Sequence, residues 1–186
     1  MAPGRPEIPY RSQYSSPCES GASTREEHLR WSRCGCGMAC LQMILAARGD
    51  RVPPLVELGL RCSRYGGYEM RPARGYGPLI YAGFVAFAAA ELGIEARVTA
   101  PLELGELIAA VHGDEVVLAS VSVEIRDLVP VPARRGGHLV LVIDADADGA
   151  RLCFHDPSGE RAAWLGAADF ERFYAGRGIA VTLPRG

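Results

Sequence analysis

The stretch CGCGMACLQMIL, residues 34–45, carries the strongest structural signal in this chain. From Cys36 onward its hydrophobic residues recur every three or four positions, which is typical of a helix with a buried face. Gly49-Asp50 provides a stop signal, and the prolines at 53 and 54 prevent the helix from resuming. We therefore predict a helix that begins at Cys36 and ends before Gly49.

Cys36 lies at the N-terminal end of the predicted helix. The positive end of the helix dipole and the free backbone N–H groups there favour the thiolate form of a cysteine. Gly35 and Gly37 flank it without side-chain bulk, so a substrate backbone could approach the sulfur closely. Because the thiolate is the reactive form, one interpretation is a catalytic nucleophile at Cys36. The other is a structural residue without chemistry, which is what we expect of Cys34, Cys40, Cys62 and Cys153.

The composition narrows the classes of function. The chain has 186 residues, of which 48% are hydrophobic and 23% charged, so it suits one globular domain with a buried core. With 20 basic and 22 acidic residues its net charge is −2, so no basic excess exists to neutralise a nucleic-acid backbone or an anionic membrane. Its longest apolar stretch, residues 79–90, is too short to cross a bilayer, and its N-terminus has no apolar signal core. We therefore expect a cytoplasmic protein with no nucleic-acid or membrane partner, whose oligomeric state is open.

Helical patterns come first in the chain and strand patterns follow. Asp148-Gly149 is a strong hairpin signal. This order predicts an α+β fold with a mostly antiparallel sheet. The expected elements are helices over residues 55–60, 79–92 and 102–111, a long loop over 61–78, a short strand over 8–10, and strands over 95–99, 116–123, 138–144, 151–155 and 179–183.

His138 stands at the mouth of a buried strand, a position that suits a general base and equally suits a histidine packed at a sheet edge. The predicted hairpin returns the chain so that His155 or Asp156 lies beside the start of that strand. Asp156 is followed by Pro157, which ends strand pairing and leaves the carboxylate free to orient the imidazole of His138. The alternative for Asp156 is capping of the turn that follows it.

The metal-binding patterns in the chain are incomplete. Cys34 and Cys36 form a single CxC with no second ligand pair for structural zinc. The aspartates at 144, 146 and 148 resemble the start of a calcium loop, yet His155 stands where the closing glutamate should be. We therefore expect no metal and no cofactor.

The order of the polar residues resembles that of a known family. Gln13, Cys36-Gly37, His138 and Asp156-Pro157 follow one another as in the C39 and C39-like cysteine peptidases, which are small papain-fold enzymes. The matching segments are residues 36–45 for the nucleophile helix, 137–143 for the histidine strand, 155–157 for the acid-bearing turn and 8–13 for the stretch with the oxyanion-hole glutamine.

The resemblance implies a papain-like fold in which the nucleophile helix packs on a mostly antiparallel sheet. We expect residues 1–33, which are polar and rich in Pro, Ser and Arg, to be an extended segment packed on a single catalytic domain of residues 34–186. The resemblance makes Cys36 the nucleophile, His138 the base and Asp156 the residue that orients the base. On the resemblance alone, Gln13 donates an N–H to the oxyanion beside the backbone N–H of Cys36.

Gln13 also separates this chain from one branch of the family. In the bacteriocin-processing branch the glutamine lies only a few residues before the cysteine, whereas here a longer stretch separates Gln13 from Cys36. This spacing is closer to the stand-alone C39-like branch. Cleavage after a double-glycine leader is therefore not implied.

Three functions fit these residues, each with a peptide or acyl substrate. The leading one is a cysteine-dependent hydrolase that cleaves a peptide or amide bond through an acyl-enzyme. The second is an acyltransferase or cyclase of a biosynthetic pathway, for which the Tyr- and Gly-rich loop 61–78 could exclude water as a lid. The third is a peptide-binding module that keeps the fold without the chemistry. Near the histidine, Arg126, Arg134 and Arg135 could recognise an acidic group or simply be solvated.

Overall fold

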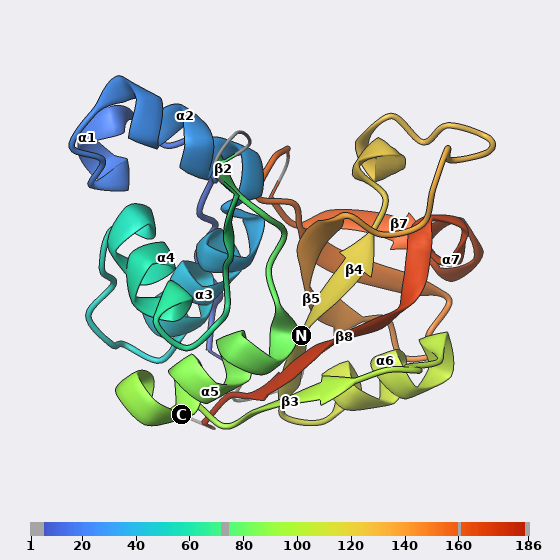
Figure 1. The fold of residues 1–186 in the computed structure, drawn as a ribbon. Coiled ribbons are helices and arrows are strands. Elements are labelled where there is room, and N and C mark those ends of the chain that lie inside the picture. Colours follow the sequence, from blue (N-terminus) through green and yellow to red (C-terminus); the bar gives the residue numbers. More distant parts are fainter. Residues whose placement is uncertain (1–5, 72–74, 160, 185–186) are drawn as a thin grey trace.

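The computed structural model describes residues 6–71, 75–159 and 161–184, which fold into a helical half and a sheet half (Figure 1). The two short strands of the helical half form a ribbon against α2. A further helix, α5, lies below α3 and α4 in the view of Figure 1. The elements of this half are α1 (Pro17–Ser20), α2 (Arg25–Cys34), α3 (Cys36–Ala47), α4 (Leu55–Ser63), β1 (Met70–Arg71), β2 (Gly75–Tyr76) and α5 (Tyr81–Leu92).

The sheet half is built on a sheet that has six strands in the described part of the chain, in the order β3-β8-β4-β5-β6-β7. Every neighbouring pair is antiparallel. The predicted α+β class with a mostly antiparallel sheet is confirmed. The elements are β3 (Ala96–Thr99), α6 (Leu104–His112), β4 (Glu115–Val121), the 3-10 helix η1 (Val123–Arg126), β5 (His138–Ala145), β6 (Arg151–His155), β7 (Ala163–Gly166), α7 (Ala167–Phe173) and β8 (Tyr174–Thr182).

The central strands of the sheet are buried on both faces. In β4, Val116 and Leu118 join the hydrophobic cluster that the helical half shares, whereas Val117 and Ala119 join a second cluster with α6 and α7. Because both faces are covered, the strand is a continuous hydrophobic run rather than an alternating one. The packing on both faces thus fixes the positions of the residues at the ends of β4 and β5.

Helix α3 begins at Cys36, as predicted, and packs against β5. Met38, Leu41 and Leu45 are buried, so the helix is fixed by its hydrophobic face. Strand β5 begins at His138. The packing of α3 on β5 therefore sets the positions of both Cys36 and His138.

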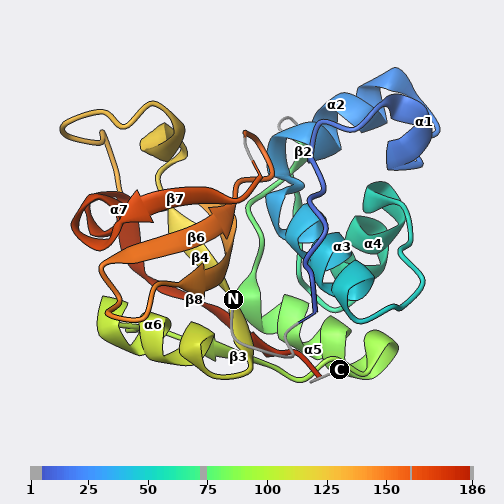
Figure 2. The same cartoon turned by 180° about the vertical axis from the view of Figure 1, so that it is seen from behind.

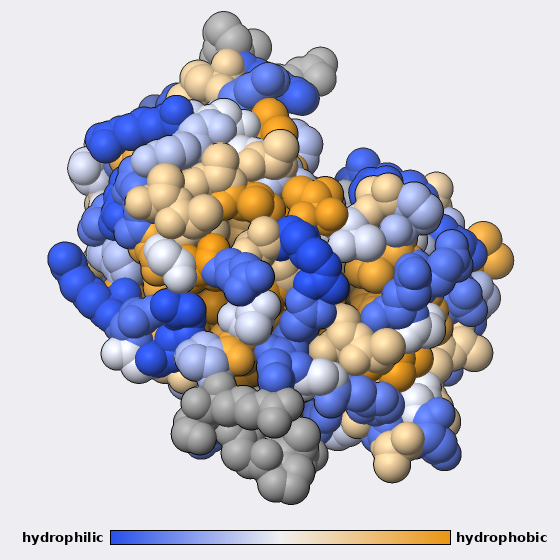
Figure 3. All heavy atoms as spheres, turned by 90° about the horizontal axis from the view of Figure 1, so that it is seen from below, coloured by the Kyte–Doolittle hydropathy of each residue, from blue (hydrophilic) through white to orange (hydrophobic). Residues whose placement is uncertain are grey.

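Helix α5 is also hydrophobic but is buried on one side only. Phe84 and Phe87 are buried, whereas Ala82, Ala86 and Ala89 are exposed. Figure 3 views the molecule from below, the side on which α5 lies in Figure 1, and shows hydrophobic and hydrophilic residues side by side on this surface.

The N-terminal segment is less extended than predicted. Within residues 1–33, the residues from 17 to 20 and from 25 onward are helical. Ser16 caps α1 in a capping box with Glu19, and the Thr24 side chain accepts a hydrogen bond from the backbone of Glu27 at the start of α2. Trp31 of α2 is completely buried, which stabilises this helix against the core.

The strand expected over residues 8–10 does not form, and separate side-chain and backbone hydrogen bonds hold this segment in place of a strand ladder. His155, which is buried, donates from Nε2 to the Ile8 carbonyl over 2.8 Å and accepts at Nδ1 from the Ala162 N–H. The Tyr10 hydroxyl donates to the Asp156 carbonyl (3.2 Å), and the Gln13 N–H donates to the Pro157 carbonyl (2.8 Å). The segment runs up the back of the molecule to α1 and α2 (Figure 2).

The other predicted elements are present with shifted ends. The helices expected over 55–60, 79–92 and 102–111 are α4, α5 and α6, and the strand expected over 179–183 is the end of the longer β8. The strand expected over 151–155 has those bounds. The elements that the sequence patterns missed are the ten-residue helix α2 and a set of shorter elements: α1, β1, β2, η1, β7 and α7.

Candidate active site

A cleft of about 640 Å³ lies between the two halves of the molecule. Gln13, Cys34 and Cys36 line it from the N-terminal segment and the junction of α2 with α3. His138 and Ser158 line it from the sheet half. Three of the four residues predicted for the site, Gln13, Cys36 and His138, therefore face one cavity, and the fourth, Asp156, lies behind His138.

Cys36 is the first residue of α3 and is partly exposed. Gly35 precedes it as the N-cap and supplies no side-chain hydrogen bond to the first turn. The N–H groups of that turn and the positive end of the helix dipole are therefore directed at the sulfur and its surroundings. This is the environment that the sequence predicted for a thiolate.

The two glycines beside Cys36 serve the packing of α3 rather than the approach of a substrate, which was the predicted role. A side chain at Gly35 would come within 2.7 Å of the Trp31 carbonyl oxygen, and one at Gly37 within 2.6 Å of Leu79. Their missing side chains let α3 pack closely on its neighbours. They do not open a path for a substrate backbone.

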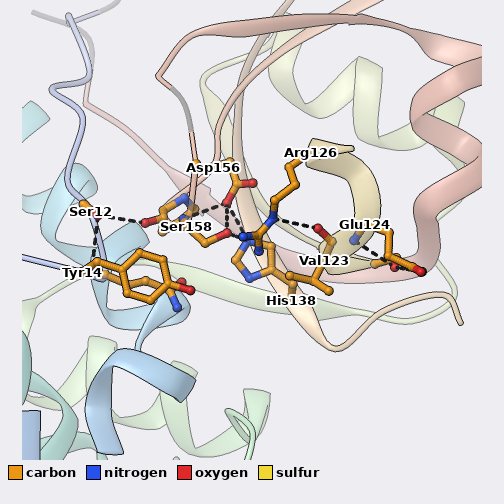
Figure 4. A network of polar contacts seen from close by, with 12 residues as sticks. Ser12, Tyr14, Val123, Glu124, Arg126, His138, Asp156 and Ser158 are labelled. Atoms are coloured by element: carbon orange, nitrogen blue, oxygen red, sulfur yellow. Dashed lines mark hydrogen bonds and ion pairs between the residues drawn. The ribbon is translucent and has the colours of Figure 1, made fainter. Parts of the chain in front are cut away.

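His138 and Asp156 form a buried pair. His138 Nε2 lies 2.7 Å from Asp156 Oδ1, and both side chains are almost fully inaccessible to water (Figure 4). This contact occupies Nε2 and leaves Nδ1 free of the carboxylate, and the Cys36 side chain is near enough to help raise the pKa of the imidazole. The geometry of the hairpin explains the pair: β6 pairs with β5 through Leu141 and His155, so the next residue, Asp156, returns to the start of β5.

Asp156 also caps the turn that follows it, so both interpretations of this residue apply. Its Oδ1 accepts hydrogen bonds from the Ser158 N–H (2.8 Å) and the Ser158 hydroxyl (2.7 Å). The same hydroxyl lies 3.2 Å from His138 Nε2 (Figure 4). Ser158 was not predicted, although a serine two residues after an Asp-Pro turn start is a recognisable turn signal.

The pKa values of the pair are displaced in opposite directions. Burial lowers the pKa of His138, but hydrogen bonds to Asp156 and Cys36 and the negative charge of these groups outweigh it and raise the pKa to about 9. Burial raises the pKa of Asp156, but the hydrogen bond and charge of His138 and the hydrogen bonds from Ser158 lower it on balance. An imidazolium beside a carboxylate is therefore the favoured state at neutral pH.

Gln13 faces the cleft, but its side chain is already partly engaged. Its Nε2 donates to the Ser32 carbonyl over 2.7 Å. Its Oε1 is buried without a hydrogen-bond partner among the described residues. One of the two amide hydrogens thus holds the end of α2, and the other has no hydrogen-bond partner among the described residues.

The other cysteines near the cleft remain protonated thiols. Burial, with a smaller effect of Cys36, raises the pKa of Cys34 to about 12, and its Sγ contacts the Arg30 carbonyl at 3.5 Å. Burial likewise raises the pKa of Cys40 well above its usual range. Cys36 is therefore the better placed of these three thiols for nucleophilic chemistry.

Among the described residues, no group of three or more His, Cys, Asp and Glu side chains could hold a metal ion. Within the same residues, no helix has the length and hydrophobicity needed to cross a bilayer.

The fold is that of the C39-like cysteine peptidases, which confirms the resemblance at the level of the fold. A protein described as a C39-like peptidase from Bacillus anthracis superposes with a TM-score of 0.60 at 13% identity, covering 97% of this chain and 96% of that one. No family model matches the sequence, and no curated protein matches it.

Two transporter-associated peptidases share the fold. The peptidase domain of Streptococcus ComA, a bifunctional ABC transporter of a quorum-sensing pathway, gives a TM-score of 0.56 at 15% identity, covering 81% of this chain and 92% of that one. A double-glycine-motif protease from an AMS/PCAT transporter, in complex with the leader peptide, gives a TM-score of 0.57 at 17% identity, covering 98% of this chain and 96% of that one.

Proposed function

We propose that this protein is a cysteine-dependent hydrolase that cleaves peptide or amide bonds. The observation that carries the proposal is the buried 2.7 Å contact between His138 and Asp156, beside a cleft that Cys36 also lines at the start of a helix. Two structural neighbours are described as a peptidase domain and a protease, and one of them was captured with a peptide bound. A peptide substrate is therefore the class that we propose.

The first half of the reaction forms an acyl-enzyme. The Cys36 thiolate attacks the carbonyl carbon of the scissile bond, and the carbonyl electrons move onto the oxygen. The Cys36 N–H and the free amide N–H of Gln13 donate to this oxyanion. The oxyanion collapses, the C–N bond breaks, and the His138 imidazolium gives its proton to the leaving amine.

The second half releases the acid product. Neutral His138 takes a proton from a water molecule, whose oxygen attacks the thioester carbon. The bond to sulfur breaks, and Cys36 leaves as a thiolate beside the regenerated imidazolium. Asp156 keeps the imidazole in place through both halves. A free nucleophilic thiol persists most readily in a reducing compartment, so we propose that the reaction takes place in the cytoplasm.

The direct test is a digest of a cell-derived peptide mixture, followed by mass spectrometry. We expect new termini with the wild-type protein and none with Cys36→Ala, and each pair of products should exceed its parent by the mass of one water. Products that instead carry an added amine or a new ring would identify acyl transfer. Peptides that bind without being cleaved by the wild-type protein would identify a binding module.

The oxyanion role of Gln13 predicts a loss that appears in kcat. We expect Gln13→Glu, which has the same shape but no N–H to donate, to lower kcat on the order of 10²-fold with little change in KM. The variant is checked for folding by its thermal unfolding, because the amide of Gln13 also holds Ser32. An unchanged kcat in a folded variant would limit Gln13 to that structural hydrogen bond.

A further inference from the structure

The charged side chains that line the cleft are of one sign. In the described part of the chain its lining includes no aspartate or glutamate, although the whole chain has more acidic than basic residues. Both walls contribute positive side chains, from α2 and β1 on one side and from η1, the connection between β4 and β5, and β8 on the other. The basic side chains that line it are five arginines: Arg33, Arg71, Arg126, Arg134 and Arg177.

Several of these guanidinium groups lie directly on the backbone of glycines. A methyl group placed on Gly137 would come within 2.8 Å of Arg134 Nη2, and one on Gly136 within 2.9 Å of Arg177 Nη2. These two glycines immediately precede His138. The missing side chains therefore let two guanidinium groups lie on the wall next to the candidate base.

The opposite wall repeats this arrangement once. A methyl group on Gly77 would lie 3.2 Å from Arg71 Nε. On the same wall as Arg134, Arg126 lines the cleft from η1, and its Nε donates to the Val123 carbonyl over 3.0 Å (Figure 4). One guanidinium group is thus held by a backbone hydrogen bond, and three others lie close to glycines at the cleft.

None of the five arginines is paired with a carboxylate among the described residues. All five side chains are exposed, so a ligand could reach them. Gathering like charges around a hollow without counter-charges raises the local positive potential, and an anionic ligand relieves it. Guanidinium groups bind carboxylates through paired hydrogen bonds, which gives geometric selectivity as well as charge.

We propose that the cleft selects peptides with Asp or Glu side chains at positions adjoining the cleaved bond. This inference rests on the proposed function, which supplies the peptide. The five arginines come from separate elements on both walls of the cleft rather than from one loop, so several carboxylates along a peptide segment fit them better than one compact anion. Exchange of the acidic side chains for their amides should together weaken recognition about tenfold.

The experiment uses two pools of short synthetic peptides that are identical except that the fixed positions are Glu in one and Gln in the other. Binding to the Cys36→Ala protein is measured by fluorescence anisotropy, and cleavage by the wild-type protein is measured separately as kcat/KM. We expect the Glu pool to be preferred about tenfold in both measurements, with a preference that declines as salt is added. Equal binding of the two pools would overturn the inference.

A matched pair of variants locates the effect. The double variant Arg126→Gln/Arg134→Gln should lose the preference for Glu, whereas Arg135→Gln should keep it, because Arg135 lines a separate depression beside Tyr174 and does not line the cleft. Loss of preference in Arg135→Gln, or its retention in the double variant, would contradict the proposal. Cleavage of both pools without preference would refute the selection of acidic peptides and leave the proposed hydrolase activity standing. A binding preference for the Glu pool without cleavage would support the selection and refute the hydrolase activity.

Discussion

The Cys36→Ala variant is expected to lose all peptide cleavage, together with alkylation at position 36 by iodoacetamide at neutral pH. The acyl-enzyme cannot form without this sulfur, and water alone is a far weaker nucleophile under these conditions. The fold should survive, since Cys36 is a partly exposed residue at the end of α3 and alanine is compatible with a helix. The measurements are kcat/KM on a cleaved peptide and the modified residue, located by fragment-ion mass spectrometry.

Cys34 supplies the matched control for this experiment. It lines the same cleft, but burial raises its pKa to about 12, so at neutral pH it remains a thiol. We expect Cys34→Ala to retain cleavage and alkylation at Cys36. Full activity in Cys36→Ala would remove Cys36 from the nucleophile role. If only the folded Cys34→Ala variant lost activity, the nucleophile would be Cys34 instead.

The elements that bear the predicted site were accessible to sequence analysis because local patterns specify them. Cys36 follows a glycine and opens a hydrophobic period of three and four, so the start of α3 is fixed by nearby residues. His138 opens a continuous hydrophobic run, and the Asp148-Gly149 turn fixes how far the chain returns. The contact between His138 and Asp156 follows from this one hairpin, without knowledge of the rest of the fold.

What the sequence analysis missed depends on contacts between distant segments or on short signals inside a polar segment. Arg71 and Arg177 reach the same cleft from β1 and β8, and no local pattern brings these strands together. The N-terminal helices did have signals, since Ser16 and Thr24 are each followed three residues later by a glutamate. The polar composition of this segment nevertheless favoured an extended chain. The burial of Trp31, which stabilises α2, depends on contacts with distant residues.

Asp156 gives the second large effect, and two substitutions separate its position from its charge. Asp156→Ala removes the oxygen that holds His138 Nε2 and Ser158, so we expect kcat/KM to fall on the order of 10³-fold. Asp156→Asn keeps an oxygen that can accept these hydrogen bonds but removes the negative charge. Its loss should be smaller, on the order of tenfold near neutral pH.

The pH profile distinguishes the two roles of the carboxylate. The pKa of His138 is raised from 6.5 to about 9, so the imidazolium is present below that value and is lost as the pH rises through it. In the wild-type protein kcat/KM should therefore decline above about pH 9. Without the charge of Asp156 the pKa of His138 falls, and the alkaline decline of Asp156→Asn should begin at a lower pH.

Ser158→Ala is the control, because it removes a hydrogen bond from the same carboxylate oxygen and leaves the charge. It should lower kcat/KM only modestly, and its alkaline decline should stay close to that of the wild-type protein. If Asp156→Asn keeps the wild-type profile and Asp156→Ala keeps its activity, the carboxylate only caps the turn after β6. The proposed triad would then be reduced to Cys36 and His138.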